Sequence, residues 1–173
     1  MAPAPRAAMT VSVHVDTAAA LRDVLAVAGP DLQRHCRDPW VVIGSAAVRL
    51  AGADVTVADL DVLTSVRDAD TLIGQWRARL DETHAPAGAE RFRSRFARFL
   101  FPGLPVEVMG GLELCGEHGW APVRIGEVVT CEVAGIAVPI PAVAEQIRIL
   151  ESFGRPKDHQ RAAWLKHLSE ERQ

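Results

Sequence analysis

The fold is decided by the stretch Val41-Val42-Ile43-Gly44-Ser45 and by the later run Ala58-Asp59-Leu60-Asp61-Val62-Leu63. The first stretch reads as a buried strand that ends in Gly-Ser. It leads into Ala46-Ala47-Val48-Arg49-Leu50, which is a good helix-forming segment. A helix that starts directly after a strand and a tight turn presents free backbone N–H groups, and its dipole favours a phosphate there.

Asp59 and Asp61 are two carboxylates one residue apart inside an apolar run. In an extended strand, side chains at i and i+2 leave the same face, so these two carboxylates project side by side. Their mutual repulsion would be relieved by a divalent cation, which prefers oxygen ligands. The alternative is a solvated edge strand whose alternate residues face water. A phosphate cradle followed by a paired-Asp strand favours metal-assisted nucleotidyl transfer.

A third carboxylate, in Val106-Glu107-Val108, completes an ordered set with Gly44-Ser45 and Asp59-x-Asp61. From about residue 40 to residue 168, the chain resembles the nucleotidyltransferase superfamily that includes DNA polymerase beta. Within it, the chain is similar to the small bacterial nucleotidyltransferases, a group with minimal, antibiotic-modifying and toxin-type members. The resemblance also takes in residues 105–111 and the tail segment 153–158.

The resemblance implies that Asp59, Asp61 and Glu107 hold Mg²⁺ or Mn²⁺ and form the catalytic set of a two-metal reaction. Glu107 stands where the family more often has Asp, and it is also a candidate to take the acceptor's proton. The alternative for Glu107 is a surface position on a strand. Gly44 and Ser45 suit the incoming phosphates, while Ser45 is alternatively an ordinary helix N-cap.

Basic residues supply candidates for the triphosphate or for a polyanionic acceptor. The segment 91–99 carries arginines at positions 91, 93, 95 and 98, and Arg95 is the preferred triphosphate ligand because its alternation aligns it with Arg93. Lys157, in the tail segment, is the second candidate nucleotide-binding residue. The alternative for the arginines is a basic face that is merely solvated. The alternative for Lys157 is an ordinary lysine in a turn. The six histidines form no catalytic spacing.

Composition describes an ordinary globular protein. The chain has 173 residues, 49% hydrophobic content, 24% charged content and a formal net charge of −3. This mild acidity argues against a protein that coats nucleic acid, although a local basic groove stays open. One domain over residues 9–173 is expected, after an Ala/Pro-rich N-terminal segment, residues 1–8, that is expected to be disordered. That segment lacks the apolar core of a signal peptide, and no apolar run reaches the ~20 residues of a membrane span.

Three cysteines, at positions 36, 115 and 131, lack the spacing of a disulfide framework, which favours a cytoplasmic protein. Cys115 and His118 have a ligand-like gap, with Cys131 as an imaginable third ligand. Because a set of four zinc ligands is incomplete, buried thiols are the favoured interpretation.

The remaining pattern predicts an α/β fold, a nucleotidyltransferase-like mixed β-sheet flanked by helices, with C-terminal helices. Helices are expected over residues 17–28 (ended by Gly29-Pro30), 31–38, 46–51, 68–82 and 141–153, and from an N-cap at Asp158 onward. Strands are expected over residues 40–43, 60–63, 91–99, 106–109, 112–115, 122–125, 128–133 and 136–139, with 91–99 and 106–109 paired as a hairpin.

Two function hypotheses follow. The first is an enzyme that moves an NMP from an NTP to an acceptor hydroxyl or phosphate, on either a small molecule or an RNA end. The second is a catalytically inactive binding or regulatory module that keeps the fold. A homodimer or an antitoxin partner is compatible with the short chain, which leaves little room for a separate acceptor domain.

Overall fold

The computed structural model describes residues 16–171, so the prediction for residues 1–8 lies outside the described residues. The described chain has five α-helices and a 3₁₀ turn: α1 (Thr17–His35), α2 (Gly44–Leu50), α3 (Val66–Gln75), η1 (Arg77–Arg79), α4 (Val143–Phe153) and α5 (Pro156–Glu171). The strands are β1 (Val41–Ile43), β2 (Leu60–Thr64), β3 (Phe92–Phe99), β4 (Val106–Gly116), β5 (Gly119–Pro122), β6 (Val128–Val133) and β7 (Ile136–Pro141).

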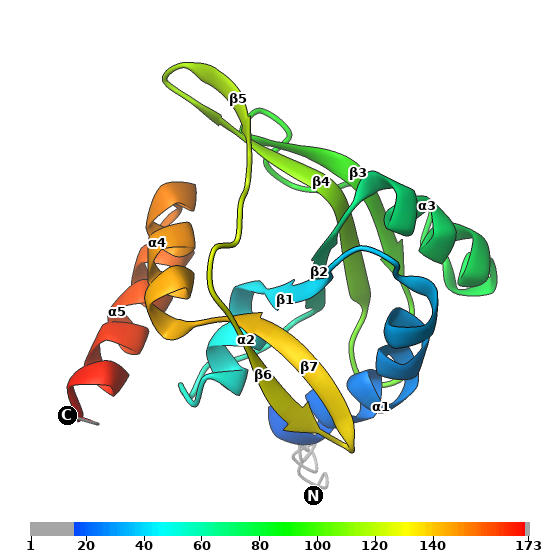
Figure 1. Ribbon diagram of the computed structural model, residues 1–173, viewed down its shortest axis with the longest axis horizontal. Coiled ribbons are helices and arrows are strands. Elements are labelled where there is room, and N and C mark those ends of the chain that lie inside the picture. Colours follow the sequence, from blue (N-terminus) through cyan, green and yellow to red (C-terminus); the bar gives the residue numbers. More distant parts are fainter. Residues whose placement is uncertain (1–15, 172–173) are drawn as a thin grey trace, which may run out of the picture.

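The main sheet is mixed, as the sequence predicts. Its strands lie in the order β1-β2-β4-β3, with β5 paired to the far end of β4. β2 and β4 run parallel, whereas the other neighbours are antiparallel. β6 and β7 form a separate hairpin. Figure 1 shows α1 and α3 on one side of the sheet and the C-terminal helices α4 and α5 on the other.

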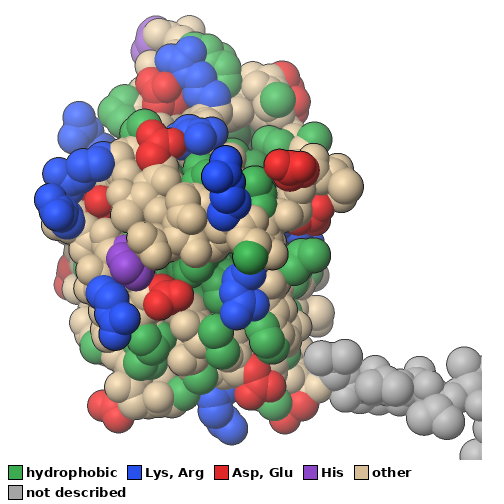
Figure 2. All heavy atoms as spheres, turned by 90° about the vertical axis from the view of Figure 1, so that its right-hand side faces the viewer, with side chains coloured by type: hydrophobic (Ala, Val, Ile, Leu, Met, Phe, Trp, Pro, Cys, Tyr) green, Lys and Arg blue, Asp and Glu red, His purple; other side chains and the backbone are tan. Residues whose placement is uncertain are grey.

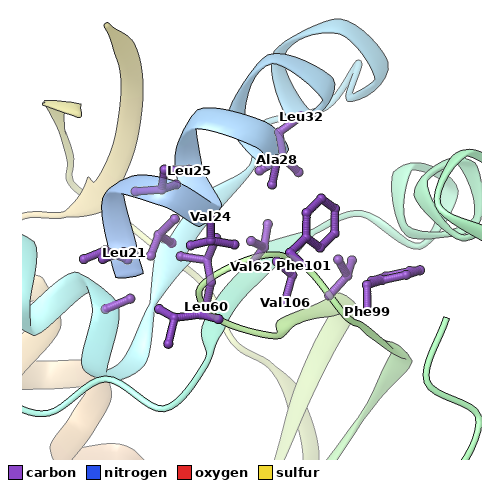
Figure 3. Packing of buried hydrophobic residues seen from close by; sticks show 14 of the residues in the cluster. Leu21, Val24, Leu25, Ala28, Leu32, Leu60, Val62, Phe99, Phe101 and Val106 are labelled. Carbon is purple, nitrogen blue, oxygen red and sulfur yellow. The ribbon is translucent and has the colours of Figure 1, made fainter. Parts of the chain in front are cut away.

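One face of the sheet carries the larger hydrophobic core (Figure 3). Leu21, Val24, Leu25, Ala28 and Leu32 of α1 pack against alternate residues of the central strands: Leu60, Val62, Phe99 and Val106. These strand residues share a face because strand side chains alternate with a period of two. Most of them are completely buried, and each such side chain contributes about 1.5–3 kcal/mol of transfer free energy.

The opposite face carries a smaller apolar cluster and the polar residues of interest. Ile43, Leu63 and Leu112 are buried there against Ile149 and Phe153 of α4. Residues in phase with Leu63 on β2 therefore point toward α4 and α5. Asp61, two residues before Leu63, is one of them, so the alternation that builds the core also places this acidic side chain.

The expected helix break at Gly29-Pro30 is wrong, because α1 runs through it to His35 with Pro30 inside. Pro30 removes one helical hydrogen bond, but the buried side chains of Ala28 and Leu32 keep this part of the helix on the core. Gly29 is needed for packing. A Cβ at this position would lie 2.7 Å from a methyl of Ile136 on β7.

Other boundaries also shift. The predicted helix 68–82 is instead α3, capped by the Ser65 side chain on the Asp68 N–H, followed by η1. Pro141 ends β7 and does not open α4, and α5 starts at Pro156 with Asp158 already inside its first turn. The strand expected over residues 122–125 lies earlier in the chain, as β5 (Gly119–Pro122). Within residues 16–171, no helix combines the length and apolar character that crossing a membrane requires.

Candidate active site

Asp59, Asp61 and Glu107 converge at one end of the parallel strand pair. Asp61 on β2 is the register partner of Glu107 on β4, so both side chains leave the same face of the sheet. Asp59 lies just before β2. Each of the three offers a carboxylate oxygen, and these oxygens all lie within 4.8 Å of one another. Among residues 16–171, this is the one cluster of three or more acidic, His or Cys side chains at such a spacing.

The carboxylates raise one another's proton affinity. The pKa of Asp61 is raised well above its usual value, first by burial and then by the charges of Asp59 and Glu107. Burial and the Glu107 charge also raise the pKa of Asp59, while Arg98 opposes that increase. Such a set is short of positive charge, and its hard oxygen donors are the ligands that Mg²⁺ and Mn²⁺ prefer.

Two side chains contact Glu107 directly. Arg98 on β3 is the register partner of Glu107, and its Nη1 lies 2.5 Å from Glu107 Oε1 and 3.7 Å from Asp59 Oδ2. Arg98 Nε also lies 3.8 Å from a carboxylate oxygen of Asp81. His84 Nε2 lies 3.2 Å from Glu107 Oε1, and the imidazole is tilted against the ring of Phe96.

Gly44 touches the acidic cluster because α2 begins there. Its φ is +67°, a conformation that favours glycine, and a Cβ would lie 2.5 Å from Asp61 Oδ2. Both constraints explain why glycine follows the strand. Ser45 is 3% exposed in the first turn of α2 and is not the N-cap, since Ile43 occupies that position. The structure therefore brings Gly44, and not the Ser45 side chain, to the cavity lining.

Helix α5 adds positive charge. Lys157 and Arg161 line the same cavity as the acidic cluster, and both lower the pKa of Asp59. Arg161 also lowers the pKa of Asp61. Asp158, completely buried, accepts a 2.6 Å hydrogen bond from Arg155 Nε and so anchors the first turn of α5. The structure thus brings the predicted residue Lys157 to the acidic cluster.

Arg95, the predicted triphosphate ligand, does not lie near the acidic cluster. Its Nε lies 2.6 Å from Asp70 of α3, on the other side of the sheet, and it does not line the cavity. The β3–β4 register shifts between Arg93 and Arg95, so the alternation expected to align these two arginines is interrupted. Arg98 lies three residues after Arg95 and therefore leaves the opposite face of the sheet, where it pairs with Glu107. Figure 2 shows that on the side of α1 and α3 the basic and acidic side chains are interspersed.

The other arginines of segment 91–99 make contacts that differ from one residue to the next. Arg93 Nε lies 2.6 Å from Glu113 Oε2, and the Arg93 guanidinium stacks over Trp120 with its carbon 4.5 Å from the ring centroid. Arg91 lies beside Gly154, at the turn between α4 and α5. The predicted arginine face is therefore divided among several local contacts and does not form one basic groove.

A cavity of about 470 Å³ extends over the acidic cluster. Its lining comes from the junction of β1 and α2, from β2, β3 and β4, from the loop 84–89 and from α4 and α5. Among the lining residues, sequence reasoning missed His84 and Arg161. His84 has no spacing signal, because its contact with Glu107 depends on folding of the loop. Arg161 lies four residues after Lys157, a helical spacing that places both on one face.

Among known proteins, only solved structures match this chain. No protein-family model matches the chain, and no curated protein matches its sequence. Solved structures do match. A candidate nucleotidyltransferase from Thermotoga maritima is 24% identical, with a TM-score of 0.62, over 81% of this chain and 88% of that chain.

Two further solved structures are similar. An antigenic nucleotidyltransferase-like protein from Paracoccidioides brasiliensis is 17% identical, with a TM-score of 0.51, over 88% of this chain and 78% of that chain. The lincosamide antibiotic adenylyltransferase LnuA, with bound lincomycin, is 12% identical, with a TM-score of 0.51, over 79% of this chain and 91% of that chain. At these identities the similarity establishes the fold.

Proposed function

We propose that this chain, which has the nucleotidyltransferase fold, is a divalent-metal-dependent nucleotidyltransferase that moves an NMP from an NTP to an acceptor hydroxyl or phosphate. The observation that carries the proposal is the convergence of Asp59, Asp61 and Glu107 to within 4.8 Å. Nothing in the hydrophobic core requires three carboxylates at this position, and their mutual repulsion costs stability.

Asp59, Asp61 and Glu107 would hold Mg²⁺ or Mn²⁺. The residues fit such an ion, since all three ligands are carboxylates. The pKa values of Asp59 and Asp61 are raised first by burial and then by the neighbouring carboxylates. When bound, such an ion supplies charge neutralisation at the phosphates and lowers the pKa of an attacking hydroxyl.

The chain's own residues perform the remaining work. Lys157 and Arg161 bind the triphosphate from α5, and Gly44 allows a phosphate to approach the start of α2 because it has no side chain. Glu107 would accept the acceptor's proton, and the ion pair with Arg98 supports the position of the Glu107 carboxylate.

The alternative is an inactive binding module that retains the fold. Against it stands the complete acidic set, because a protein that no longer handled metal and nucleotide would gain stability by losing one carboxylate. The test is calorimetric titration of ATP with and without Mg²⁺, followed by incubation with α-labelled NTPs. Binding that strengthens at least ~10-fold with Mg²⁺ supports the enzyme, whereas metal-independent binding contradicts it.

Lys157→Gln should raise the KM for NTP about 10-fold, because a charge-assisted contact to the triphosphate is lost. Lys166→Gln is the matched control on the same helix, where Lys166 instead pairs with Glu151. Arg95→Gln should leave this KM unchanged, because Arg95 pairs with Asp70 outside the cavity. Steady-state kinetics of pyrophosphate release measures all three variants. An unchanged KM in Lys157→Gln would remove Lys157 from the site.

The other expectations stay as proposals. The three free cysteines support a reducing, cytoplasmic location. A homodimer or an antitoxin partner remains compatible with the chain. The bound lincomycin of LnuA supports a small-molecule acceptor by similarity of fold, and an RNA end is the competing acceptor.

A further inference from the structure

Two neighbouring rows of side chains cross the face of the sheet that carries the acidic cluster. The strand register places Asp61, Glu107 and Arg98 in one row. Two residues further along β4 and β3, the next row holds Met109 and its register partner Phe96. Because a strand rises about 3.3 Å per residue, this apolar row lies about 7 Å from the acidic row.

The apolar row forms the floor of a chamber within the 470 Å³ cavity. Phe92, Phe96 and Met109 are only partly buried there, although apolar side chains of this size are usually enclosed. Pro86 and Ala87, in the loop 84–89, line the same cavity and add a wall to the chamber. A concave apolar surface next to a few polar groups is typical of small-molecule sites, whose volumes are about 300–1,000 Å³.

The charged residues around the acidic cluster distinguish the part of the cavity that attracts a triphosphate from the part that does not. Lys157 and Arg161 act on Asp59, at the α5 end. His84 instead reaches Glu107 from the loop 84–89, where it is tilted against Phe96 with the ring centroids 6.0 Å apart. The triphosphate is attracted to the α5 end, so its pyrophosphate leaves on that side. In-line displacement then requires the attacking oxygen to approach from the opposite side, which is the side of His84 and Phe96.

We infer that the chamber of Phe92, Phe96, Met109, Pro86 and Ala87 is the acceptor subsite, and that it takes a small molecule with an apolar ring or alkyl face and a free hydroxyl. This inference rests on the proposed function. The acceptor oxygen forms a bond to the α-phosphorus of the NTP as the bond to pyrophosphate breaks. The electron pair of the broken bond leaves with pyrophosphate, and the hydroxyl proton passes to the Glu107 carboxylate and from there to solvent.

The same surface is unsuited to an RNA end. Single strands are held by a continuous basic groove with stacking aromatics. Here, Arg93 lines the cavity but is paired with Glu113, and Arg95 is paired with Asp70 outside it. The five residues of the chamber itself carry no charge. An apolar face on the acceptor, in contrast, covers the accessible parts of the Phe92 and Phe96 rings and removes them from water.

The test uses the neutral aromatic probe N-phenyl-1-naphthylamine, whose fluorescence rises in an apolar site, titrated into the full-length protein. We expect saturable binding that Mg²⁺ plus ATP changes by less than about 2-fold, since the nucleotide occupies the other end of the cavity. Phe96→Ala should weaken probe binding at least ~10-fold, because an aromatic contact surface is lost. Trp120→Ala, an exposed aromatic outside the cavity, is the matched control and should leave it unchanged.

A second variant guards against misfolding of Phe96→Ala. Ala87→Trp changes an exposed loop residue and fills the chamber from its wall, so it should block the probe while the melting temperature is retained. Probe displacement by Mg²⁺ plus ATP would assign the chamber to the nucleobase and overturn the inference. Displacement by a 12-nucleotide RNA with a free 3′-hydroxyl, or absence of saturable binding, would overturn it too.

The outcome is separable from that of the proposed function. Probe binding requires neither metal nor turnover, whereas the nucleotidyltransferase proposal fails on metal-independent ATP binding. A protein that binds ATP with Mg²⁺ but does not bind the probe retains the proposed function and loses the acceptor subsite.

Discussion

Asp61→Asn is expected to lower the rate of nucleotidyl transfer by about 10³-fold or more while the protein stays folded. Asn keeps the size of the side chain but removes the charge that would bind the ion, so charge in the transition state is no longer neutralised. Pyrophosphate release with saturating NTP and Mg²⁺ measures the effect. Turnover close to that of the wild-type protein would contradict the metal assignment.

The same substitution should raise stability in metal-free buffer at neutral pH. The folded-state pKa of Asp61 lies well above the ordinary value of 3.8, because of burial and of the Asp59 and Glu107 charges. Between those two pKa values the folded protein binds more protons than the unfolded chain, so the free energy of unfolding falls as pH rises. This pH-dependent loss should be reduced in Asp61→Asn.

Thermal melts from pH 4 to pH 8, with EDTA and then with Mg²⁺, measure this effect. The metal-free wild-type protein should lose stability as pH rises above about 4 and regain it when Mg²⁺ is added. Asp61→Asn should show a smaller pH dependence and little Mg²⁺ stabilisation. A variant that Mg²⁺ stabilises as much as the wild-type protein would place the ion elsewhere.

Glu107→Gln is expected to lower turnover by about 10²-fold or more, because the third carboxylate serves as metal ligand or as proton acceptor. Nucleotide binding should survive better than turnover, since Asp59, Asp61 and Lys157 still hold the triphosphate. Glu107→Asp should retain part of the activity, because it keeps the carboxylate and only shortens its reach. Parallel measurements of kcat and of ATP affinity separate these effects.

Glu113→Gln is the matched control for Glu107→Gln. Glu113 lies on the same strand and also pairs with an arginine, Arg93, but it does not line the cavity. Its substitution should leave kcat unchanged. If Glu107→Gln turned over as fast as Glu113→Gln, Glu107 would have no catalytic role. Another carboxylate would then be needed beside Asp59 and Asp61.

Most of the secondary structure could be predicted from local pattern. The alternation around Leu60 and Val62 identifies β2, and the hairpin expected between segment 91–99 and Val106 is present as β3 and β4. The prediction failed at Pro30, where the local breaking signal is overridden by burial of Ala28 and Leu32 on the core. A local propensity of a few kcal/mol is smaller than the packing of a whole helix face.

The sequence by itself determined which groups this protein has for its chemistry: a glycine directly after a buried strand, two carboxylates that share a strand face, and a third carboxylate on a later strand. These follow from short-range periodicity, which depends only on neighbouring residues. That Glu107 lies beside Asp61 was decided by the parallel pairing of β2 with β4, a contact between distant segments. Likewise, the pairing of β3 with β4 placed Arg98 beside Glu107, while Arg95, three residues earlier, leaves the opposite face of the sheet. The packing of α5 decided the position of Lys157. Strand register and helix docking minimise the free energy of the whole core, so no single segment encodes them.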